Sequence, residues 1–374
     1  SVGQKKKRRA MAGLPPPPPP GGPPPPPPPP PPGGPPPPPP PPPPQIPSSS
    51  PSDGARAAYG APGMPGSRDY WLWSLAELTE VTMSREDGVP FAEEVKARRE
   101  CTQLIAEAAK MLDCSRSPAM TAAAFVNRFY LFQSVRDRAL PNLLVATTCL
   151  YIACKVEEEP RPLRDVVKVC MRIRHRAVPS LAAQFDMESP SYDPARYEKE
   201  KEAVLRIERT VLSNIGYDLD APHPYKHIVP ALAHVRAVMS AAGLKYPAEE
   251  RERLGGLSWR LLGDSMHTLA LVQFAPRAIA VASVELAARL LGIDIPTKAP
   301  RERYAAQAPA RWYEALGSEH EGRLTPEVID EVAHQLLDVY EETAAREAGK
   351  PMPAGFITAA AAQAQMSLSG MRAR

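Results

Sequence analysis

The stretch Leu143–Lys155, which reads LLVATTCLYIACK, decides how this sequence folds. It contains no charge before Lys155, and apolar or small side chains fall on every side of the helix that it predicts. Such a helix belongs in the middle of a bundle, because any side turned to water would expose apolar surface. The sequence therefore predicts a helical bundle with this segment at its centre.

Helical periodicity extends outward from this stretch in both directions, and strand-like alternation is absent after residue 66. The helices predicted in the first unit are 91–112, 118–133, 140–157, 162–175 and 194–215. A second unit follows Pro222-His223-Pro224, with predicted helices at 225–242, 248–272, 276–291, 307–317 and 326–347. The two units share the order and lengths of their helices but little sequence identity, so the repeat is architectural. The prediction is an all-α protein with two tandem five-helix bundles.

Several helix ends are marked by local sequence signals. A capping side chain precedes a proline at three predicted helix starts, namely Ser117-Pro118, Asp193-Pro194 and Thr325-Pro326. Gly216 fits a helix C-terminus, and residues 176–193 are predicted to form a loop. Residues 70–80 are apolar enough to dock on the first unit as an extra helix.

The N-terminal segment 1–66 is predicted to be a disordered tail. Thirty of the 49 prolines lie there, mostly in the unbroken runs 15–20, 23–32 and 35–44. Proline lacks an amide donor and has a fixed φ, so these runs cannot build a packed core. The formal net charge is +3. Five basic residues contribute +5 of this charge: Lys5, Lys6, Lys7, Arg8 and Arg9. They form a candidate nuclear-import signal, and the alternative is a solubilising or cloning-derived terminus.

Composition also excludes several classes of function. Residues 10–374 have no basic excess, so no direct nucleic-acid partner is expected. The longest apolar runs fall short of the roughly 20 residues that span a membrane, and no signal peptide is predicted. Five cysteines without a CxxC spacing are expected to be reduced, buried thiols of a cytosolic or nuclear protein. We expect no cofactor, no metal and no catalytic residue, since no nucleophile elbow, phosphate-binding glycine loop or HExxH motif occurs.

Two charged residues fall where a bundle would place its core. Glu208 lies near the middle of the apolar face predicted for helix 194–215, and a lone carboxylate there is costly unless it is paired. Lys155, at the end of the apolar helix, is the natural cation. The pair is either a structural ion pair inside the bundle or a surface pair completed by the backbone of a partner. By contrast, the acidic run Glu157–Glu159 is predicted to be a solvated helix end, and His223 and His227 to be surface or capping residues.

Four blocks of this sequence resemble the cyclin box in order and spacing. They are Asn127–Tyr130 (NRFY), Leu143–Glu158, Pro160–Val166 (PRPLRDV) and Arg206–Leu212 (RIERTVL). The resemblance covers about residues 91–345. It is closest to the transcription and RNA-processing cyclins, particularly cyclin L, through EEEPRPLRDVV at 157–167, HPYKHIV at 223–229 and CTQLIAEAAKML at 101–112.

The resemblance implies a domain plan and a partner. The plan is a tail (1–66), an extension helix (67–90), a first cyclin box (91–220), a second, degenerate box (221–348) and a C-terminal tail (349–374). The implied function is that of a non-catalytic, nuclear subunit that binds and activates a cyclin-dependent Ser/Thr kinase in RNA polymerase II transcription or pre-mRNA processing. The implied kinase-binding residues are Lys155, Glu208, Glu158, Arg161 and Arg164.

Two departures from the family pattern and one alternative accompany this interpretation. The first predicted helix lacks the Met-Arg-Ala-Ile-Leu stretch and the tryptophan of cell-cycle cyclins, so no substrate-docking patch is expected there. The cyclin L resemblance implies an arginine–serine-rich tail, and residues 349–374 contain no such stretch. The alternative function is that of a scaffold whose proline runs bind SH3, WW or profilin-type partners.

Overall fold

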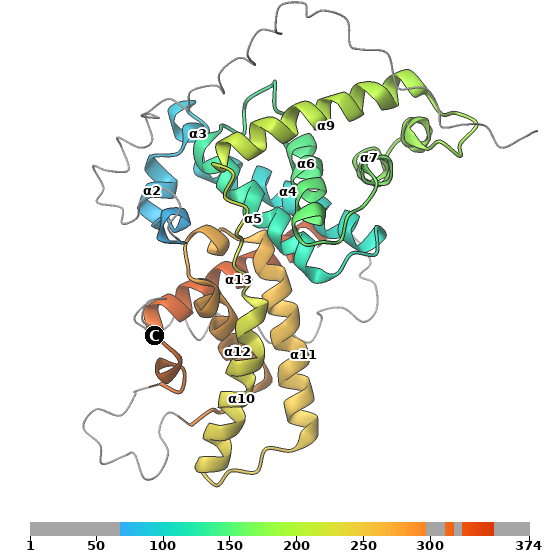
Figure 1. Cartoon of the computed structure of the whole chain (residues 1–374). Coiled ribbons are helices and arrows are strands. Elements are labelled where there is room, and N and C mark those ends of the chain that lie inside the picture. Colours follow the sequence, from blue (N-terminus) through green and yellow to red (C-terminus); the bar gives the residue numbers. More distant parts are fainter. Residues whose placement is uncertain (1–67, 297–310, 318–323, 348–374) are drawn as a thin grey trace, which may run out of the picture. The chain divides into compact units, whose positions relative to one another are not determined.

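The computed structural model describes residues 68–296, 311–317 and 324–347, and all regular secondary structure within these ranges is helical (Figure 1). The first half contains η1 (Arg68–Trp71), α2 (Leu75–Glu80), α3 (Met83–Glu86), α4 (Phe91–Met111), α5 (Arg116–Phe132), α6 (Asn142–Val156), α7 (Leu163–Arg174), α8 (Pro179–Ala182), η2 (Ala183–Phe185) and α9 (Pro194–Asn214). The second half contains α10 (Tyr225–Ala241), α11 (Ala248–Asp264), η3 (Ser265–His267), η4 (Ala270–Val272), α12 (Pro276–Leu291), η6 (Glu314–Leu316) and α13 (Pro326–Glu347). The all-α prediction is confirmed for the described residues, outside which both predicted tails lie.

The apolar stretch forms α6 and is the centre of the first bundle. Ten of its residues are buried, from Leu144 to Cys154 with only Tyr151 half-buried. The helix packs against α4, α5, α7 and α9 (Figure 1). In this position other helices cover every side of α6 and bury its apolar surface, as the sequence predicts.

The second bundle repeats this arrangement around α12. Its residues Ala278–Ala288 are all buried, and the helix packs against α10, α11 and α13. Alanine is frequent on α12, so the side chains in this second core are smaller than those of α6. Gly292 ends the helix in the left-handed conformation (φ +68°).

The second predicted helix of the second unit is shorter in the structure. The prediction of a helix over 248–272 is wrong beyond Asp264, where the chain turns into η3 and η4. These two turns contact α4 and α5 of the first bundle, and Val272 O accepts a hydrogen bond of 2.7 Å from Trp73 N. The apolar periodicity of the sequence continues to residue 272, but the helix ends at Asp264. The residues after Asp264 instead pack against residues distant in sequence.

Of the three helix starts predicted from a capping residue before proline, two are correct and one is wrong. Asp193 caps α9, with its side chain accepting from Ala195 N (3.0 Å) and Arg196 N (3.2 Å). Thr325 precedes Pro326 at the start of α13, as predicted. The third start is wrong by two residues, because Ser115 is the capping residue of α5 and Pro118 lies inside its first turn.

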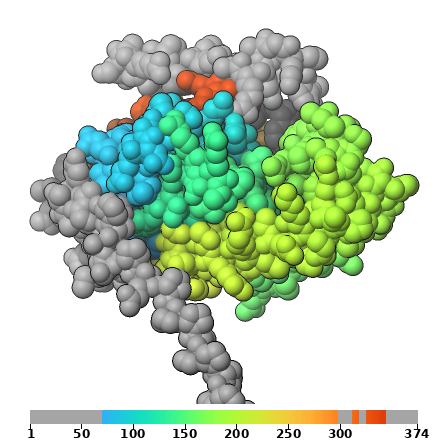
Figure 2. All heavy atoms as spheres, turned by 90° about the horizontal axis from the view of Figure 1, so that it is seen from above, coloured from blue at the N-terminus to red at the C-terminus, as the bar shows by residue number. Residues whose placement is uncertain are grey.

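The segment before α4 forms three short elements instead of the one extension helix that we predicted. Trp71, Trp73 and Leu78 are buried in the core of the first bundle. Trp71 Nε1 donates to Asp218 Oδ2 (2.7 Å), and the guanidinium of Arg128 lies 4.7 Å from the centre of the Trp71 ring. Figure 2 shows this segment in blue against the teal helices of the bundle. The chain starts a new helix, α3, after Thr82, whose side chain makes no capping hydrogen bond, and this start divides the predicted helix.

Candidate functional site

Lys155 and Glu208 form an ion pair that joins the end of α6 to α9. The Lys155 ammonium contacts Glu208 Oε1 and also lies 4.2 Å from the centre of the Tyr151 ring. The Lys155 side chain is 42% exposed and the Glu208 side chain 16%. The pair therefore lies at the surface of the first bundle and is not enclosed within it. The physical reason is that α6 leaves the core in its last turn, where Lys155 lies.

The face of α9 that packs on the core is narrower than its apolar periodicity suggests. Val204, Ile207 and Val211 are buried, whereas Leu205 is 39% exposed. Glu208 therefore lies at the edge of the packed face, and our prediction that it lies near the middle of an apolar face is wrong. Leu205 and Glu208 are three residues apart on one side of the helix. The ion pair consequently has an exposed apolar neighbour.

The turn after α6 holds a glutamate in a strained conformation. Glu159 N donates to Cys154 O (2.9 Å) and Glu158 N to Lys155 O (3.3 Å), the two bonds of a Schellman motif. Glu158 occupies the left-handed position of this motif, with φ +57°. A non-glycine residue costs about 1–2 kcal/mol there. Its side chain is exposed beside the Lys155 turn.

The two acidic neighbours of Glu158 have structural partners, so the prediction that 157–159 is a solvated helix end is wrong for them. The Thr121 hydroxyl donates to Glu157 Oε1 (2.6 Å), and His223 Nε2 lies 3.1 Å from that oxygen. His223 is therefore a buried, hydrogen-bonded residue and not a surface one. Hydrogen bonds from Ser115 hold the pKa of Glu159 below its ordinary value. The signal that local reasoning missed is the pairing of these acids with residues 36 to 66 positions away.

The two arginines of the predicted site differ in their surroundings. Arg161 donates from Nε to Leu112 O (2.9 Å) and from Nη2 to Asp113 O (2.7 Å), so it holds the carbonyl end of α4. Arg164 lies on α7 with 65% of its side chain exposed, 3.4 Å from Asp165. The structure thus joins Lys155 to Glu208 and places Glu158 in the adjoining turn. The Arg161 guanidinium is hydrogen-bonded to backbone carbonyls of the same chain. The candidate import cluster, Lys5–Arg9, lies outside the described residues.

Metal-binding and membrane-spanning features are absent from the described ranges. No group of three or more histidine, cysteine or acidic residues within them could hold a metal ion, and no helix there is long and apolar enough to cross a membrane. The five cysteines are free thiols. Burial raises the pKa of Cys101 and of Cys170 to about 12, so these two thiols stay protonated.

Two consecutive bundles, each built around an apolar third helix, define a protein with the cyclin fold. Residues 72–220 match the cyclin N-terminal domain. The chain is 29% identical to Cyclin-T1-3 of Oryza sativa subsp. japonica over 274 residues, which are 73% of this chain and 48% of the relative. It is 28% identical to Cyclin-K of Homo sapiens over 272 residues, 73% of this chain and 41% of the relative. Residues 72–220 therefore carry a cyclin N-terminal domain, and the chain is similar to the T and K cyclins. It spans about half the length of these curated relatives or less.

Solved structures share the fold. A chain of the yeast RNA Pol II CTD kinase CTDK-1 complex superposes with a TM-score of 0.51 at 15% identity, covering 80% of this chain and 83% of that one. A chain of the CAK complex of Chaetomium thermophilum gives a TM-score of 0.52 at 17% identity, covering 85% and 95%. Both relatives named above are T or K cyclins, and the assignment to the cyclin L branch stays a prediction.

Proposed function

We propose that this protein is a non-catalytic regulatory subunit that binds and activates a cyclin-dependent Ser/Thr kinase acting in RNA polymerase II transcription. The observation that carries the proposal is the surface ion pair between Lys155 and Glu208. The kinship with T and K cyclins supports the kinase partner, and one solved complex that contains the same fold is an RNA polymerase II CTD kinase. A role in pre-mRNA processing and a nuclear location belong to the same proposal.

The pair retains unused hydrogen-bonding capacity. An ammonium has three donors and a carboxylate has two acceptor oxygens. Within the described chain, Lys155 donates to Glu208 Oε1, and Glu208 Oε2 has no hydrogen bond. A docked kinase segment would supply backbone carbonyls to Lys155 and backbone N–H groups to Glu208. Leu205 and Tyr151 would contribute apolar contact beside these bonds.

Docking would remove water from around the pair. The pair would then contribute more free energy to binding than it contributes to the stability of the free protein. An exposed pair contributes about 0–1 kcal/mol to stability. Truncating one partner of a desolvated pair at an interface costs about 2–5 kcal/mol. Shifting a kinase from about 1:99 to 99:1 active requires roughly 5.5 kcal/mol of differential affinity. The pair and its apolar surround would supply a large part of that difference.

Co-purification from nuclear extract, with kinases identified by mass spectrometry, tests the proposal. We expect Lys155→Ala or Glu208→Ala to reduce kinase recovery by at least about 30-fold. The circular dichroism spectrum should stay helical. Lys201→Ala is the matched control, because Lys201 forms a solvent-exposed pair with Glu198 on the same helix. Unchanged kinase recovery with either site variant would overturn the interface assignment.

A double charge reversal separates an interface role from a structural one. The variant Lys155→Glu with Glu208→Lys restores an intramolecular pair but reverses the groups offered to a partner backbone. If the pair acts at the interface, the double variant binds no better than either single alanine variant. Restored kinase binding would assign the pair a structural role.

The proline runs favour a second candidate function. Runs of 6 to 10 prolines at 15–20, 23–32 and 35–44 are sequences of the kind that SH3, WW and profilin-type domains bind. We propose recruitment through residues 1–66 as an activity separate from kinase activation. Deleting 1–66 should then leave kinase activation unchanged while capture of such domains disappears. Loss of kinase activation on deletion would contradict that separation.

A further inference from the structure

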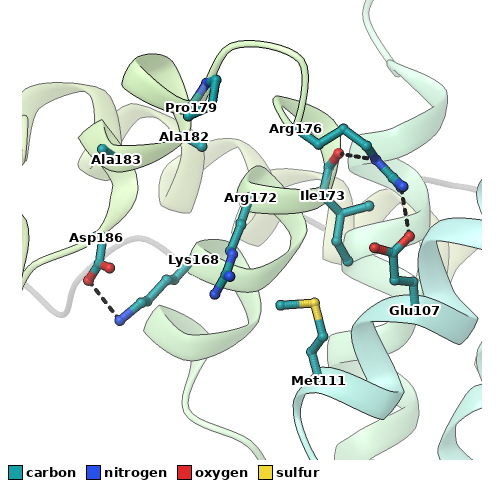
Figure 3. A pocket seen from close by; sticks show the side chains of 10 residues that line it. All are labelled: Glu107, Met111, Lys168, Arg172, Ile173, Arg176, Pro179, Ala182, Ala183 and Asp186. Atoms are coloured by element: carbon teal, nitrogen blue, oxygen red, sulfur yellow. Dashed lines mark hydrogen bonds and ion pairs between the residues drawn. The ribbon is translucent and has the colours of Figure 1, made fainter.

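A groove lies on the first bundle, between the end of α4, α7 and the α8–η2 segment (Figure 3). Its volume is about 500 Å³, enough for a side chain with its flanking backbone. Met111 and Ile173 provide apolar lining, and Met111 is 41% exposed. The surface is separate from the Lys155–Glu208 pair, which involves α6 and α9.

Basic residues recur along the side of α7 that borders the groove. Arg164, Lys168 and Arg172 follow one another at four-residue spacing, and Arg176 continues the series in the turn after the helix. Residues four apart are neighbours on a helix surface. The last three of the four line the groove. We call Lys168, Arg172 and Arg176 the basic triad.

Two members of the triad are paired with carboxylates on the groove wall. Lys168 Nζ lies 2.7 Å from Asp186 Oδ1, and Arg176 Nη2 lies 2.6 Å from Glu107 Oε2. All four side chains are partly exposed, so these pairs are weak and exchangeable. Hydrogen bonding to Asp186 raises the pKa of Lys168, which is therefore charged at physiological pH.

Arg172 is the member of the triad without a carboxylate in contact. It is exposed, and no ion pair joins it to another residue of the described chain. Figure 3 shows its side chain directed into the groove, toward the opening between Lys168 and Met111. An arginine presents a planar fork of donors that matches two oxygens of a phosphate. The groove thus offers one free guanidinium flanked by two cations that can change partners.

We propose that this groove binds a peptide segment containing phosphoserine or phosphothreonine, with Arg172 as the principal phosphate ligand. Lys168 and Arg176 would turn from Asp186 and Glu107 to the phosphate, which carries nearly two negative charges against one on each carboxylate. Met111 and Ile173 would contact the residues next to the phosphorylated one. Clustered arginines are a recurrent means of recognising phosphopeptides.

The lining favours a peptide over a nucleic acid. Single-stranded nucleic acids are bound by aromatic platforms in grooves of unneutralised positive charge. This groove has no aromatic lining residue, and two of its three cations are partly neutralised by carboxylates. Its apolar lining and small volume suit a phosphorylated side chain with an apolar neighbour.

Fluorescence anisotropy with the full chain tests the proposal without any kinase. The probes are two labelled nonapeptide libraries with randomised flanks, one with phosphoserine and one with serine at the centre. We expect the phosphorylated library to bind at least about ten-fold more tightly. Arg172→Gln should remove most of that preference. Arg236→Gln, which changes an exposed arginine on α10, is the matched control and should change nothing.

A gain-of-function variant makes the test sharper. Asp186→Asn frees Lys168, so we expect it to strengthen binding of the phosphorylated library about three-fold. Equal affinity for the two libraries, or an unchanged affinity of Arg172→Gln, would overturn the proposal. So would displacement of the phosphopeptide by a single-stranded RNA 12-mer that binds more tightly and depends on Arg172, since that result would identify a nucleic-acid surface.

Discussion

The two bundles each join their central helix to their last helix by an ion pair, but the surroundings of these pairs differ. In the first bundle, Lys155 of α6 meets Glu208 of α9, and Glu208 Oε2 has no hydrogen bond within the described chain. In the second, Arg289 of α12 contacts Asp330 of α13 (2.7 Å) and also Glu285 (2.9 Å).

The remaining oxygen of Glu285 accepts a 2.6 Å hydrogen bond from Trp312 Nε1. The charged groups of this pair in the second bundle therefore have their partners within the bundle and stabilise its packing. The first presents a pair with hydrogen-bonding capacity left for a partner. One architecture thus serves two purposes, and the difference lies in how completely its charged groups are satisfied within the chain.

The largest stability effect that we predict contrasts the two central helices. Leu150→Ala in α6 removes a fully buried side chain and should lower the free energy of unfolding by about 3–5 kcal/mol. Val284→Ala in α12 removes fewer atoms and should cost about 2 kcal/mol. Urea denaturation measures both. Equal losses would contradict the view that the first core depends on larger side chains.

The second prediction concerns His267, which lies where η3 meets the first bundle. Burial, with a contribution from Arg99, lowers the pKa of His267 to about 4, against an ordinary value of about 6.5. The unfolded chain therefore takes up this proton first as the pH falls, and stability declines between about pH 6.5 and pH 4. Over this range the free energy of unfolding falls by roughly 1.4 kcal/mol per pH unit.

Denaturation at several pH values, with His267→Gln for comparison, measures this contribution. Thr102 Oγ1 lies 2.9 Å from His267 Nδ1, and glutamine keeps a polar group for it. The glutamine variant should show a shallower decline over this pH range. An identical pH dependence of the two proteins would exclude His267 as the cause.

The third prediction tests the comparison of the ion pairs directly. Glu285→Ala leaves the buried Trp312 Nε1 without its acceptor and should cost about 2 kcal/mol of stability. Glu208→Ala breaks a more exposed pair and should cost less than about 1 kcal/mol, although it removes kinase binding under our proposal. Thermal unfolding of both variants gives the result. A larger loss for Glu208→Ala would reverse the roles that we assign to the two pairs.

The smallest effect concerns the ends of the same two helices. Glu158→Gly relieves a left-handed glutamate and should raise stability by about 1 kcal/mol, which corresponds to about 2–4 °C in Tm. Gly292→Ala places a side chain in the equivalent position after α12 and should lower stability by a similar amount. If the Glu158 carboxylate contacts the kinase, Glu158→Gly weakens binding while it stabilises the fold. A destabilised Glu158→Gly variant would contradict the strain argument.

Sequence reasoning reached the central features of the site because they depend on short-range pattern. An apolar helix that ends in Lys155 is readable from periodicity. The pairing with Glu208 was predicted from the high cost of a lone charge in a core, although the structure places Glu208 at the edge of the packed face. The roles of Glu157, Glu159 and His223 were not readable in that way, because their partners lie far away in sequence. The basic triad was readable in principle from its four-residue spacing, but α4 and the α8–η2 segment are needed to make a groove of it.

The sequence by itself determined the helical class and the central position of α6. Each of these follows from composition or from a period of 3.6 residues, which are local properties of a chain. Tertiary structure alone decided that α11 ends at Asp264, that the Lys155–Glu208 pair lies at the surface and that Arg172 faces a groove. Exposure and charge pairing depend on contacts between segments remote in sequence, and such contacts exist only once the helices have packed.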